Sequence, residues 1–584
     1  MDVVRQVQRE IGDVPQEAID LIAAELGIHR VEVEGLVSFY AFYGDGPHGR
    51  IVIRLCNDVV DRLQGADKVA EALSEELGIP FGGTTEDGLF SLRHTPCIGM
   101  SDQAPAALVN DVVVTRLTPD RAREMVRELR RHQDPKRLVK TLGDGMNAHP
   151  LVQSMVMNNL WQAGPVVFAP LPMGAAVRKA MAMSPAEVIR EVKTARLRGR
   201  GGAGFPTGMK WEFTRAAEGE RRVVVCNADE GEPGTFKDRV ILTERIDLVL
   251  EGMTIAAYAI GADTGIIYLR GEYEYLLPLI EHAINVRREA GLLGCSICCK
   301  DGFNFDVRVQ LGAGAYVCGE ETALLSSCEG LPGTPKTRPP FPAQKGYLGL
   351  PTAVNNVETF CCAARIIDQG AAWFAQMGTK GSTGTKVLSI SGDCRRPGVY
   401  ELPFGVTIAE LLNMVGGEGA IAVQVGGASG RMIGPAEYGR HICYDDLATG
   451  GSIVVFGPDR DPLWVAREYM DFFIEESCGY CTPCRVGNVL LREYLDRIVS
   501  GKGTKEDIAM LEDLAETVKT TSRCGLGQTS PNPVLTTLAN FKDLYQARVK
   551  PGPVGFLPTF DLGRALAEGE RLQGRKSVLH GGHG

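Results

Sequence analysis

The stretch Gly199-Arg-Gly-Gly-Ala-Gly-Phe-Pro-Thr-Gly-Met-Lys210 decides how the centre of this 584-residue chain folds. Five of its twelve residues are glycine. That is too many for the interior of a helix or strand, because glycine loses the most backbone entropy on folding and supplies no packing. The free N–H groups of such a loop can form a concave site for an anion such as phosphate. Phe205 could stack on a planar ring and Lys210 could meet phosphate, so we predict a nucleotide-binding loop rather than a surface loop without a ligand.

The residues before this loop separate it from the ordinary dinucleotide fingerprint. The spacing G-x-G-x-x-G begins at Gly199, but in that fingerprint the motif directly follows a strand. Residues 185–197 instead carry Val188, Ile189 and Val192 at helical spacing. A glycine loop that follows a helix predicts a nucleotide site of another kind.

Composition and charge exclude several classes of protein. The formal net charge of −10 leaves no basic surface to neutralise nucleic-acid phosphates, and no apolar run approaches the roughly 18 residues of a membrane helix. The N-terminus lacks the charged and apolar regions of a signal peptide. Sixteen cysteines, partly clustered, are more typical of reduced thiols and metal ligands than of disulfides. We therefore expect a cytoplasmic protein, with about four domains for its length.

The N-terminal part begins with helices and continues as a small α/β unit. Residues 1–48 look helical, because Ile19, Ile22 and Ala23 are spaced for one helix face and Gly27 stands where that helix would end. The pattern that follows predicts a strand over 51–55, a helix over 66–77, and strands over 107–110 and 112–114.

Two cysteines of this unit, Cys56 and Cys97, raise the question of an iron–sulfur cluster. The unit resembles the thioredoxin-like [2Fe–2S] subunit of respiratory complex I and its relatives, which binds its cluster with two pairs of thiolates. The resemblance implies partners near Asp61 and at Ser101, and neither residue is cysteine. Because two thiolates cannot supply the usual four ligands, we predict that the domain keeps the fold and has lost the cluster. The alternative is an unusual ligand set.

A connector over 133–175, rich in proline and glycine, leads to a second α/β domain that begins near Ser184. One of its strands runs into a second glycine loop, Gly312-Ala-Gly-Ala-Tyr-Val-Cys-Gly-Glu-Glu321, which opens onto a helix at Thr322. The free N–H groups and the dipole of a helix start favour an anionic ligand. The expected strands are 223–226, 266–270 and 307–311, and a helix is expected over 274–289.

Three short segments could complete a ligand pocket beside the two loops. The acids of Asn227-Ala-Asp-Glu-Gly-Glu-Pro-Gly-Thr-Phe-Lys-Asp-Arg239 could hydrogen-bond sugar hydroxyls or form a capped turn, and neither interpretation is preferred. The amides of Asn355-Asn-Val-Glu-Thr359 could bind the polar edge of a ring or cap the next helix. Pro339-Pro-Phe-Pro342 places an aromatic ring on a rigid loop, which suits the wall of a pocket for a flat ligand.

The rest of the chain changes first to short strands and then to helices. Strands over 387–390, 399–402 and 423–425, with a helix over 408–415, suit a small β-grasp module that serves packing or docking. From Leu463 to about residue 548 the pattern is helical.

Four cysteines in this helical part have the spacing of an iron–sulfur site. Cys478, Cys481 and Cys484 form C-x2-C-x2-C, and Cys524 follows forty residues later. Three thiolates on one loop and a distant fourth are typical ligands of a [4Fe–4S] cluster. Structural zinc more often uses two separated C-x2-C pairs, so the cluster is the preferred interpretation.

Together these motifs resemble one protein family over most of the chain. Residues 184–548 are similar to the flavoprotein subunit of complex I and its relatives, through both glycine loops, Asn227-Ala-Asp-Glu230, Asn355-Asn-Val-Glu358 and the cysteine set. With the thioredoxin-like unit fused ahead, the chain most resembles the large diaphorase subunits of cytoplasmic NAD-reducing [NiFe] hydrogenases. The implied fold is α/β multidomain, with these domains: 1–132, a helical lead and thioredoxin-like domain; 133–183, a linker; 184–384, a Rossmann-like FMN- and NAD-binding domain; 385–460, a β-grasp module; 461–550, a helical bundle with the [4Fe–4S] cluster; and 551–584, a tail.

The resemblance implies a diaphorase reaction with FMN, NAD(H) and one [4Fe–4S] cluster. NAD(H) carries hydride and a cluster carries one electron, so flavin, which handles both, must lie between them. The implied catalytic residues are Glu321, which would tune the flavin or position the nicotinamide, and Phe205, which would stack on the dinucleotide. The implied cofactor-binding residues are Gly199, Arg200, Gly201, Gly202, Gly204, Phe205, Lys210, Phe213, Asn227, Asp229, Glu230, Glu232, Gly319, Glu320, Glu321, Phe341, Asn355 and Asn356, and the implied cluster ligands are Cys478, Cys481, Cys484 and Cys524.

The chain has no visible site for activating hydrogen, because no separated C-x2-C pairs suggest nickel ligation. The resemblance therefore implies partners, namely an iron–sulfur relay subunit and [NiFe] hydrogenase subunits, in a hetero-oligomer that reduces NAD+ with H2. The runner-up is the diaphorase subunit of an NAD-dependent formate dehydrogenase, or an NADH-oxidising module of complex I. A nucleotide-free electron-transfer scaffold is a hypothesis of a different class, which bound flavin would exclude. The sequence does not separate NAD from NADP.

Overall fold

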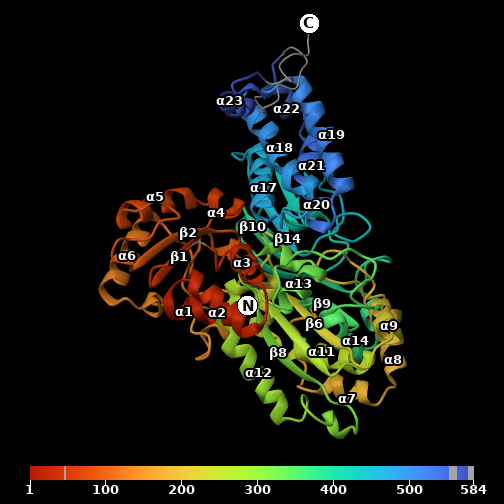
Figure 1. Cartoon of the computed structure of the whole chain (residues 1–584). Coiled ribbons are helices and arrows are strands. Elements are labelled where there is room, and N and C mark those ends of the chain that lie inside the picture. The colour runs from red at the N-terminus through yellow and green to blue at the C-terminus, as the bar shows by residue number, and fades with distance from the viewer. Residues whose placement is uncertain (45, 47, 551–561, 577–584) are drawn as a thin grey trace.

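Three β-sheets organise the part of the chain that the computed structural model describes, residues 1–44, 46, 48–550 and 562–576 (Figure 1). Figure 1 shows the N-terminal α/β unit at the left, the central domain below and the C-terminal helices at the top. These helices and sheets confirm a multidomain protein of mixed α/β class. Within the described ranges, no helix combines the length and the apolar character that crossing a bilayer requires.

The N-terminal region contains three leading helices and a four-stranded sheet. Gly27 ends the second helix with a φ of 66°, as predicted. The sequence does not predict the second strand, because its buried residues include Ser91 and Arg93 and so lack apolar alternation. The helices are α1 (Asp2–Ile11), α2 (Gln16–Leu26), α3 (Arg30–Phe39), α4 (Val59–Leu63), α5 (Ala66–Leu77) and α6 (Pro119–His132), and the sheet has the order β2-β1-β3-β4, from β1 (Ile51–Cys56), β2 (Phe90–Thr95), β3 (Ala107–Val109) and β4 (Val112–Val114).

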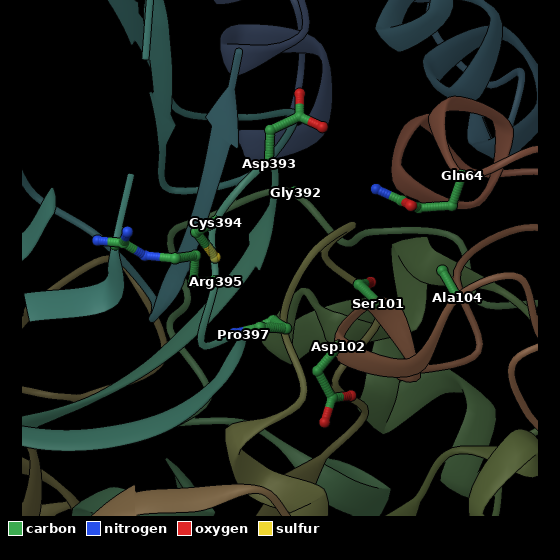
Figure 2. Close-up of a pocket in the computed structure, with 10 residues that line it drawn as sticks. Gln64, Ser101, Asp102, Ala104, Gly392, Asp393, Cys394, Arg395 and Pro397 are labelled. Carbon is green, nitrogen blue, oxygen red and sulfur yellow. The ribbon is translucent and has the colours of Figure 1, made fainter. Parts of the chain in front are cut away.

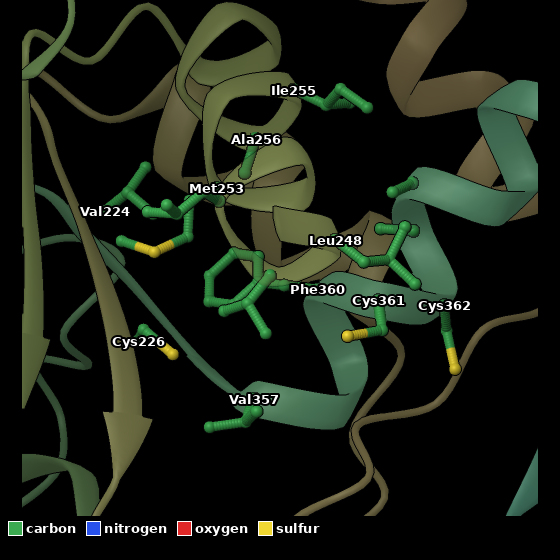
Figure 3. Close-up of a cluster of buried hydrophobic side chains, with 14 of the residues drawn as sticks. Val224, Cys226, Leu248, Met253, Ile255, Ala256, Val357, Phe360, Cys361 and Cys362 are labelled. Atoms are coloured by element: carbon green, nitrogen blue, oxygen red, sulfur yellow. The ribbon is translucent and has the colours of Figure 1, made fainter. Parts of the chain in front are cut away.

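The central domain is a four-stranded parallel sheet with the order β8-β7-β6-β9. Side chains of its middle strand, among them Val224 and Cys226, pack against Met253 and Phe360 of two covering helices (Figure 3). The strands are β6 (Val223–Ala228), β7 (Thr264–Leu269), β8 (Asp306–Leu311) and β9 (Thr352–Asn356). The helices are α7 (Ala175–Met181), α8 (Pro185–Thr194), α9 (Thr207–Ala216), α10 (Lys237–Glu244), α11 (Ile246–Ile260), α12 (Leu277–Glu289), α13 (Glu321–Cys328), α14 (Val357–Gln369) and α15 (Ala371–Ala375).

The first glycine loop lies between α8 and α9, which confirms the prediction of a helix before it. Gly202 and Gly204 have φ values of 123° and 65°, which residues with a Cβ rarely adopt. A Cβ at Gly204 would also lie 2.6 Å from ring carbons of Tyr444. The hydroxyl of Tyr444 donates a hydrogen bond to the carbonyl of Gly199. The loop is therefore held closely against the neighbouring domain.

The third sheet has six strands in the order β13-β12-β14-β10-β11-β5, and one of them comes from the connector. Proline and glycine in the connector predict no regular structure there, but β5 pairs with β11. Glu401, buried on β11, accepts hydrogen bonds from the backbone N–H groups of Gly164, Val166, Val167 and Phe168. The strands are β5 (Leu160–Gln162), β10 (Thr385–Gly392), β11 (Gly398–Pro403), β12 (Ala422–Val425), β13 (Arg431–Ile433) and β14 (Ser452–Phe456), and the helix is α16 (Ile408–Val415).

The C-terminal helices follow the predicted helical pattern. Of the predicted tail over 551–584, the described residues are 562–576, where α23 (Leu562–Gln573) forms, and the remaining positions lie outside the described residues. The other helices are α17 (Pro462–Glu476), α18 (Thr482–Val499), α19 (Lys505–Thr521), α20 (Gly525–Thr529), α21 (Asn532–Asn540) and α22 (Lys542–Arg548).

The N-terminal region packs into the central domain rather than standing apart from it. Tyr40, which follows α3, is fully buried and donates a hydrogen bond to Ser327 of α13 at 2.8 Å. Arg239 of α10 is also fully buried, and it donates to the carbonyl of Gly99 at 3.1 Å. Arg270, after β7, donates to the carbonyl of Cys97. The central domain therefore fixes the loop that carries Cys97.

Candidate functional site

A cavity of about 880 Å³ lies where the two glycine loops meet. Its walls come from both loops, from α9, from the end of β9, from the proline-rich loop around Phe341, and from Gly525 of α20. Cavities of this size accommodate cofactors. The predicted cofactor residues that line it are Gly199, Gly201, Gly204, Phe205, Lys210, Phe213, Asn227, Gly319, Glu320, Glu321, Phe341, Asn355 and Asn356.

Three phenylalanines supply flat, accessible walls. Phe205, Phe213 and Phe341 line the cavity and are 45%, 47% and 50% exposed. An aromatic ring left this open at a cavity wall can stack on a planar ligand. The arrangement therefore suits the stacking role predicted for these residues.

Charged side chains gather on another wall of the cavity. The ammonium group of Lys210 lies 3.0 Å from the Glu321 carboxylate and also donates to the Val354 carbonyl at 2.9 Å. Arg338 lies 3.5 Å from Glu321 and 3.6 Å from Glu320. Two cations at a cavity wall suit the phosphates of a nucleotide. The motifs did not identify Arg338, which stands directly before Pro339 at the start of the proline-rich loop.

The acidic segment after β6, residues 227–239, lies partly at the cavity and partly in the interior. Asn227 lines the cavity, and its amide donates to the Gly319 carbonyl at 2.8 Å. Asp229, Glu230 and Glu232 are not among the lining residues. Burial raises the pKa of Asp229 well above its ordinary value, and its Oδ2 atom has no hydrogen-bond partner among the described residues.

The two other acids of this segment have protein partners. Glu230 accepts hydrogen bonds from the N–H of Asp238 at 2.8 Å and the hydroxyl of Tyr273 at 2.9 Å. Burial raises the pKa of Glu230 to about 7, and the neighbouring Asp238 contributes to this rise. Glu232 accepts from Tyr316 at 2.7 Å and from the Ser429 hydroxyl at 2.8 Å. Of these partners only Asp238 lies within the segment, and the others come from distant parts of the chain.

The paired amides cap a helix and also face the cavity. Oδ1 of Asn356 accepts a hydrogen bond from the N–H of Glu358 at 3.0 Å, which caps α14. Its amide nitrogen donates to Asp238 at 2.6 Å. Asn355 accepts from the indole of Trp211 at 2.9 Å. Both residues line the cavity, so the two interpretations of this motif are compatible.

Arg200 and Gly202 are not among the lining residues. The Arg200 side chain is fully buried, and its guanidinium donates to the carbonyls of Arg198 at 3.0 Å and Thr383 at 2.7 Å. Its backbone N–H donates to the Thr359 hydroxyl at 2.9 Å. Arg200 therefore anchors the loop to neighbouring residues.

The structure brings the four predicted cluster cysteines near one another, because Cys478, Cys481 and Cys524 all interact electrostatically with Cys484. Cys481 occupies the N-cap position of α18, Cys484 lies in its first turn, and Cys524 occupies the N-cap position of α20. The Ser477 hydroxyl lies 3.2 Å from the Cys484 sulfur, and the Asn488 amide donates to that sulfur at 3.4 Å. Burial raises the pKa of Cys484 to about 11, and a bound metal cation would favour its thiolate form.

The donor set of this site is four thiolates, three from one loop and one from a distant turn. Four cysteine thiolates are the usual ligands of a [4Fe–4S] cluster, so these residues fit that group. Within the described residues, no three of the four sulfurs lie within 4.8 Å of one another, whereas a lone zinc ion would need sulfurs about 3.8 Å apart.

The N-terminal cysteines do not fit a [2Fe–2S] cluster of the usual kind. Cys56 and Cys97 are both buried, and the Cys97 sulfur lies 3.5 Å from the Ser101 hydroxyl. Asp61, at the other expected position, is 1% exposed. Two thiolates, a carboxylate and a hydroxyl are not the four-thiolate set that such a cluster uses.

Three family models match successive parts of the chain. Residues 1–130 match "Thioredoxin-like [2Fe-2S] ferredoxin", residues 192–365 match "Nuo51 FMN-binding domain", and residues 464–548 match "NADH-ubiquinone oxidoreductase-F iron-sulfur binding region". These matches agree with the predicted order of the thioredoxin-like, flavin-binding and cluster-binding parts.

Several proteins are similar to the chain. The NAD-reducing hydrogenase HoxS subunit alpha of Cupriavidus necator is 46% identical over 98% of this chain and 95% of its own length. The NADP-reducing hydrogenase subunit HndC of Solidesulfovibrio fructosivorans is also 46% identical, over 64% of this chain and 78% of its own length. A chain in the crystal structure of an H2-reduced NAD+-reducing [NiFe]-hydrogenase matches with a TM-score of 0.86 and 37% identity, over 98% of this chain and 97% of that one. Because the first and third matches span nearly the whole of both chains, this protein belongs to the family of alpha subunits of NAD-reducing hydrogenases.

Proposed function

We propose that the chain is the diaphorase subunit of an NAD-reducing hydrogenase. When bound, FMN would exchange hydride with NAD(H) and single electrons with the [4Fe–4S] cluster, because flavin is competent for both. The chain's own residues bind these groups, align them and exclude water from the cavity between the glycine loops.

One observation carries this proposal, the adjacency of the cavity and the cysteine site. Gly525 lines the cavity, and the residue before it is Cys524. Cys524 also caps the helix that Gly525 begins. The wall of the cavity that would hold flavin therefore includes the residue next to a predicted cluster ligand.

Different walls of the cavity suit different parts of the ligands. Phe205, Phe213 and Phe341 are positioned to stack on planar rings, and Lys210 with Arg338 is positioned to hold phosphate. Glu321, held between the two cations, is the carboxylate available to a ribose or a nicotinamide amide. No side chain acts as acid or base in hydride transfer itself.

The proposed partners are an iron–sulfur relay subunit and [NiFe] hydrogenase subunits. Support comes from the near-complete match to a subunit of an NAD-reducing hydrogenase, which includes the fused N-terminal domain. An NADH-quinone oxidoreductase subunit of Rhizobium meliloti is 42% identical but matches over only 64% of this chain. The fusion therefore favours the hydrogenase over complex I. We place the protein in the cytoplasm because none of the sixteen cysteines forms a disulfide.

The finer fold assignment follows the same proposal. The parallel sheet β8-β7-β6-β9 is the Rossmann-like part, the sheet around β10 and β14 is the β-grasp module, and α17 to α22 form the helical bundle. The domain limits 1–132, 133–183, 184–384, 385–460, 461–550 and 551–584 stay predictions.

The proposal is tested on the purified full-length chain by its FMN content, its iron content and NADH-dependent reduction of an artificial dye. We expect one FMN, about four iron atoms and dye reduction. A Gly201→Val variant should lose FMN and activity but keep its iron, because a Cβ there already lies 3.2 Å from Asn356 and a larger side chain narrows the cavity.

Gly439→Ala is the matched control, because nothing lies within 4 Å of a Cβ at that position. It should keep both cofactors and full activity. Folded wild-type protein with neither flavin nor dye reduction would leave the scaffold hypothesis as the better one.

A further inference from the structure

A buried group of metal-ligand side chains lies at the C-terminal end of β1, outside the diaphorase site. Cys56 ends β1, Asp58 caps α4, and Asp61 lies within α4. One ligand atom from each of these three residues lies within 4.8 Å of the others. All three are buried, and Asp58 and Asp61 are 6% and 1% exposed. The spacing is short enough for one ion to contact all three.

Asp58 has an unused oxygen in this group. Its Oδ1 accepts a hydrogen bond from the N–H of Asp61 at 2.9 Å, which forms the cap of α4. Its Oδ2 is buried and has no hydrogen-bond partner in the part of the chain that the structure describes. The Asp61 carboxylate accepts from the N–H of Ala106 at 2.7 Å. A buried carboxylate oxygen without a partner is energetically costly unless a cation is present.

Nearby arginines are paired with other carboxylates. Arg62, which follows Asp61, pairs with Asp67 and Glu468. Arg270 contacts this region only through the Cys97 carbonyl, and its guanidinium pairs with Glu272 at 2.8 Å. Neither arginine hydrogen-bonds to Asp58 or Asp61 in the described residues, so these carboxylates lack a protein cation.

The loop from Cys97 to Ser101 lies beside this group. Cys97 is near enough to Cys56 and Asp58 to interact with both electrostatically, but its sulfur is not within 4.8 Å of all three ligand atoms. Its backbone is fixed by the buried guanidinium groups of Arg270 and Arg239, which bind the carbonyls of Cys97 and Gly99. The two arginines therefore hold this loop in place without a cluster.

Two cavities lie near this group, one beside α17 and the other beside the end of β10. A cavity of about 130 Å³ is lined by Asp58 and Arg62 together with the acids Glu468, Asp471 and Glu475 of α17. A second cavity, of about 420 Å³, has Ser101 in its wall (Figure 2). Figure 2 shows Ser101 and Asp102 on one side of this cavity, with Asp393 and Cys394 across it. The acidic cavity offers a cation a favourable path to Asp58.

We propose that Cys56, Asp58 and Asp61 bind one divalent metal ion in place of a [2Fe–2S] cluster. One thiolate and two carboxylates suit zinc, which takes sulfur and oxygen ligands in four-coordinate sites and can complete its set with water. Such an ion supplies the positive charge that the two buried carboxylates lack, and binding displaces the thiol proton of Cys56.

The test is the metal content of the full-length chain, purified without chelator, dialysed against EDTA and analysed by mass spectrometry. We expect one zinc per chain in addition to the iron of the other site. An Asp58→Asn variant should lose the zinc and keep its iron, because asparagine preserves the helix cap but removes the ligand charge. A Cys56→Ser variant should do the same. Cobalt-loaded protein should show thiolate-to-cobalt absorption that Cys56→Ser abolishes.

Cys328→Ser is the matched control, because Cys328 is a buried thiol at the end of α13 and belongs to no such group in the described part of the chain. It should keep the full zinc content. Folded wild-type protein without zinc overturns the proposal, and so does zinc that survives both Asp58→Asn and Cys56→Ser. About two further iron atoms in place of zinc would also overturn it, because the domain would then hold an iron–sulfur cluster with an unusual ligand set.

Discussion

At the scale of single residues, one wall of the cavity between the glycine loops holds a carboxylate beside two cations. Glu321 stands 3.0 Å from Lys210 and 3.5 Å from Arg338. The motifs predicted Lys210 and Glu321, but nothing in the sequence indicated that Arg338 joins them. That contact depends on the path of the proline-rich loop, which lies in no helix or strand and so leaves no periodic pattern to read.

Replacing Glu321 with glutamine should raise the KM for NADH about tenfold, because a charge-assisted hydrogen bond to the dinucleotide becomes a weaker neutral one. FMN and iron contents should stay at wild-type levels. Steady-state dye-reduction kinetics measure the effect. Glu212→Gln is the control, because Glu212 pairs with Lys193 on the exposed side of α9. An unchanged KM and kcat in Glu321→Gln would remove Glu321 from the dinucleotide site.

Glu230 should make stability depend on pH. Its pKa in the folded protein, about 7, lies above the ordinary value of 4.5. The folded state therefore retains a proton that the unfolded state loses. The resulting stabilisation is complete below pH 4.5 and is lost as the pH rises to about 7.

The difference in apparent melting temperature between Glu230→Gln and wild type should consequently be more favourable to the variant at about pH 8 than at about pH 5. The gain corresponds to roughly 1–3 kcal/mol. Thermal unfolding at both pH values, followed by fluorescence, measures the difference. A gap between variant and wild type that is the same at both pH values would contradict the assignment.

At the scale of elements, strands with a continuous apolar run and helices with clear end signals were predictable. The strand at 223–226, the helix at 66–77 and the stop at Gly27 all formed. The sequence missed β5, which lies in the proline-rich connector and is only three residues long. Its place depends on pairing with β11 and on Glu401, and such long-range contacts leave no local pattern.

Glu401→Gln should destabilise the third sheet. The carboxylate accepts N–H groups through both oxygens, and an amide would turn one acceptor into a donor that faces those N–H groups. We expect a loss of about 2 kcal/mol or more, seen as a lower apparent melting temperature. Glu418→Gln, which breaks a surface pair with Arg395, should change it little. Equal melting temperatures for the two variants would show that Glu401 does not hold the connector.

At the scale of the whole molecule, the order of the parts could be read from motifs, but their mutual packing could not. The cysteine spacing alone predicted the convergence of Cys524 with Cys478, Cys481 and Cys484. Nothing local indicated that Arg239 would bind the loop of another domain, because a single arginine in an α/β segment is usually solvent-exposed. This buried contact fastens the N-terminal domain to the central one.

Arg239→Ala should loosen that attachment. The substitution removes the guanidinium that lies 3.4 Å from the buried Asp102 carboxylate. Leaving a buried charge without its partner costs about 3–5 kcal/mol of stability. Limited proteolysis of the full chain should then release the N-terminal domain faster than from wild type. Arg221→Ala, which removes an exposed pair with Asp263, is the control and should digest like wild type. Unchanged cleavage in Arg239→Ala would mean that other contacts suffice.

The two arginines that bind the Cys97 loop have a consequence for how this domain can change over evolutionary time. In a domain whose ligand loop is held only by its cluster, losing one cysteine removes the electron carrier and also the fold of that loop. Here Arg239 and Arg270 hold the loop from the central domain. The cluster can therefore be lost without loss of the loop's structure. Ligand positions can drift from cysteine to aspartate or serine while the domain survives as a wall of the neighbouring flavin domain. A domain that carried electrons can in this way lose that role and remain as a structural part of the protein.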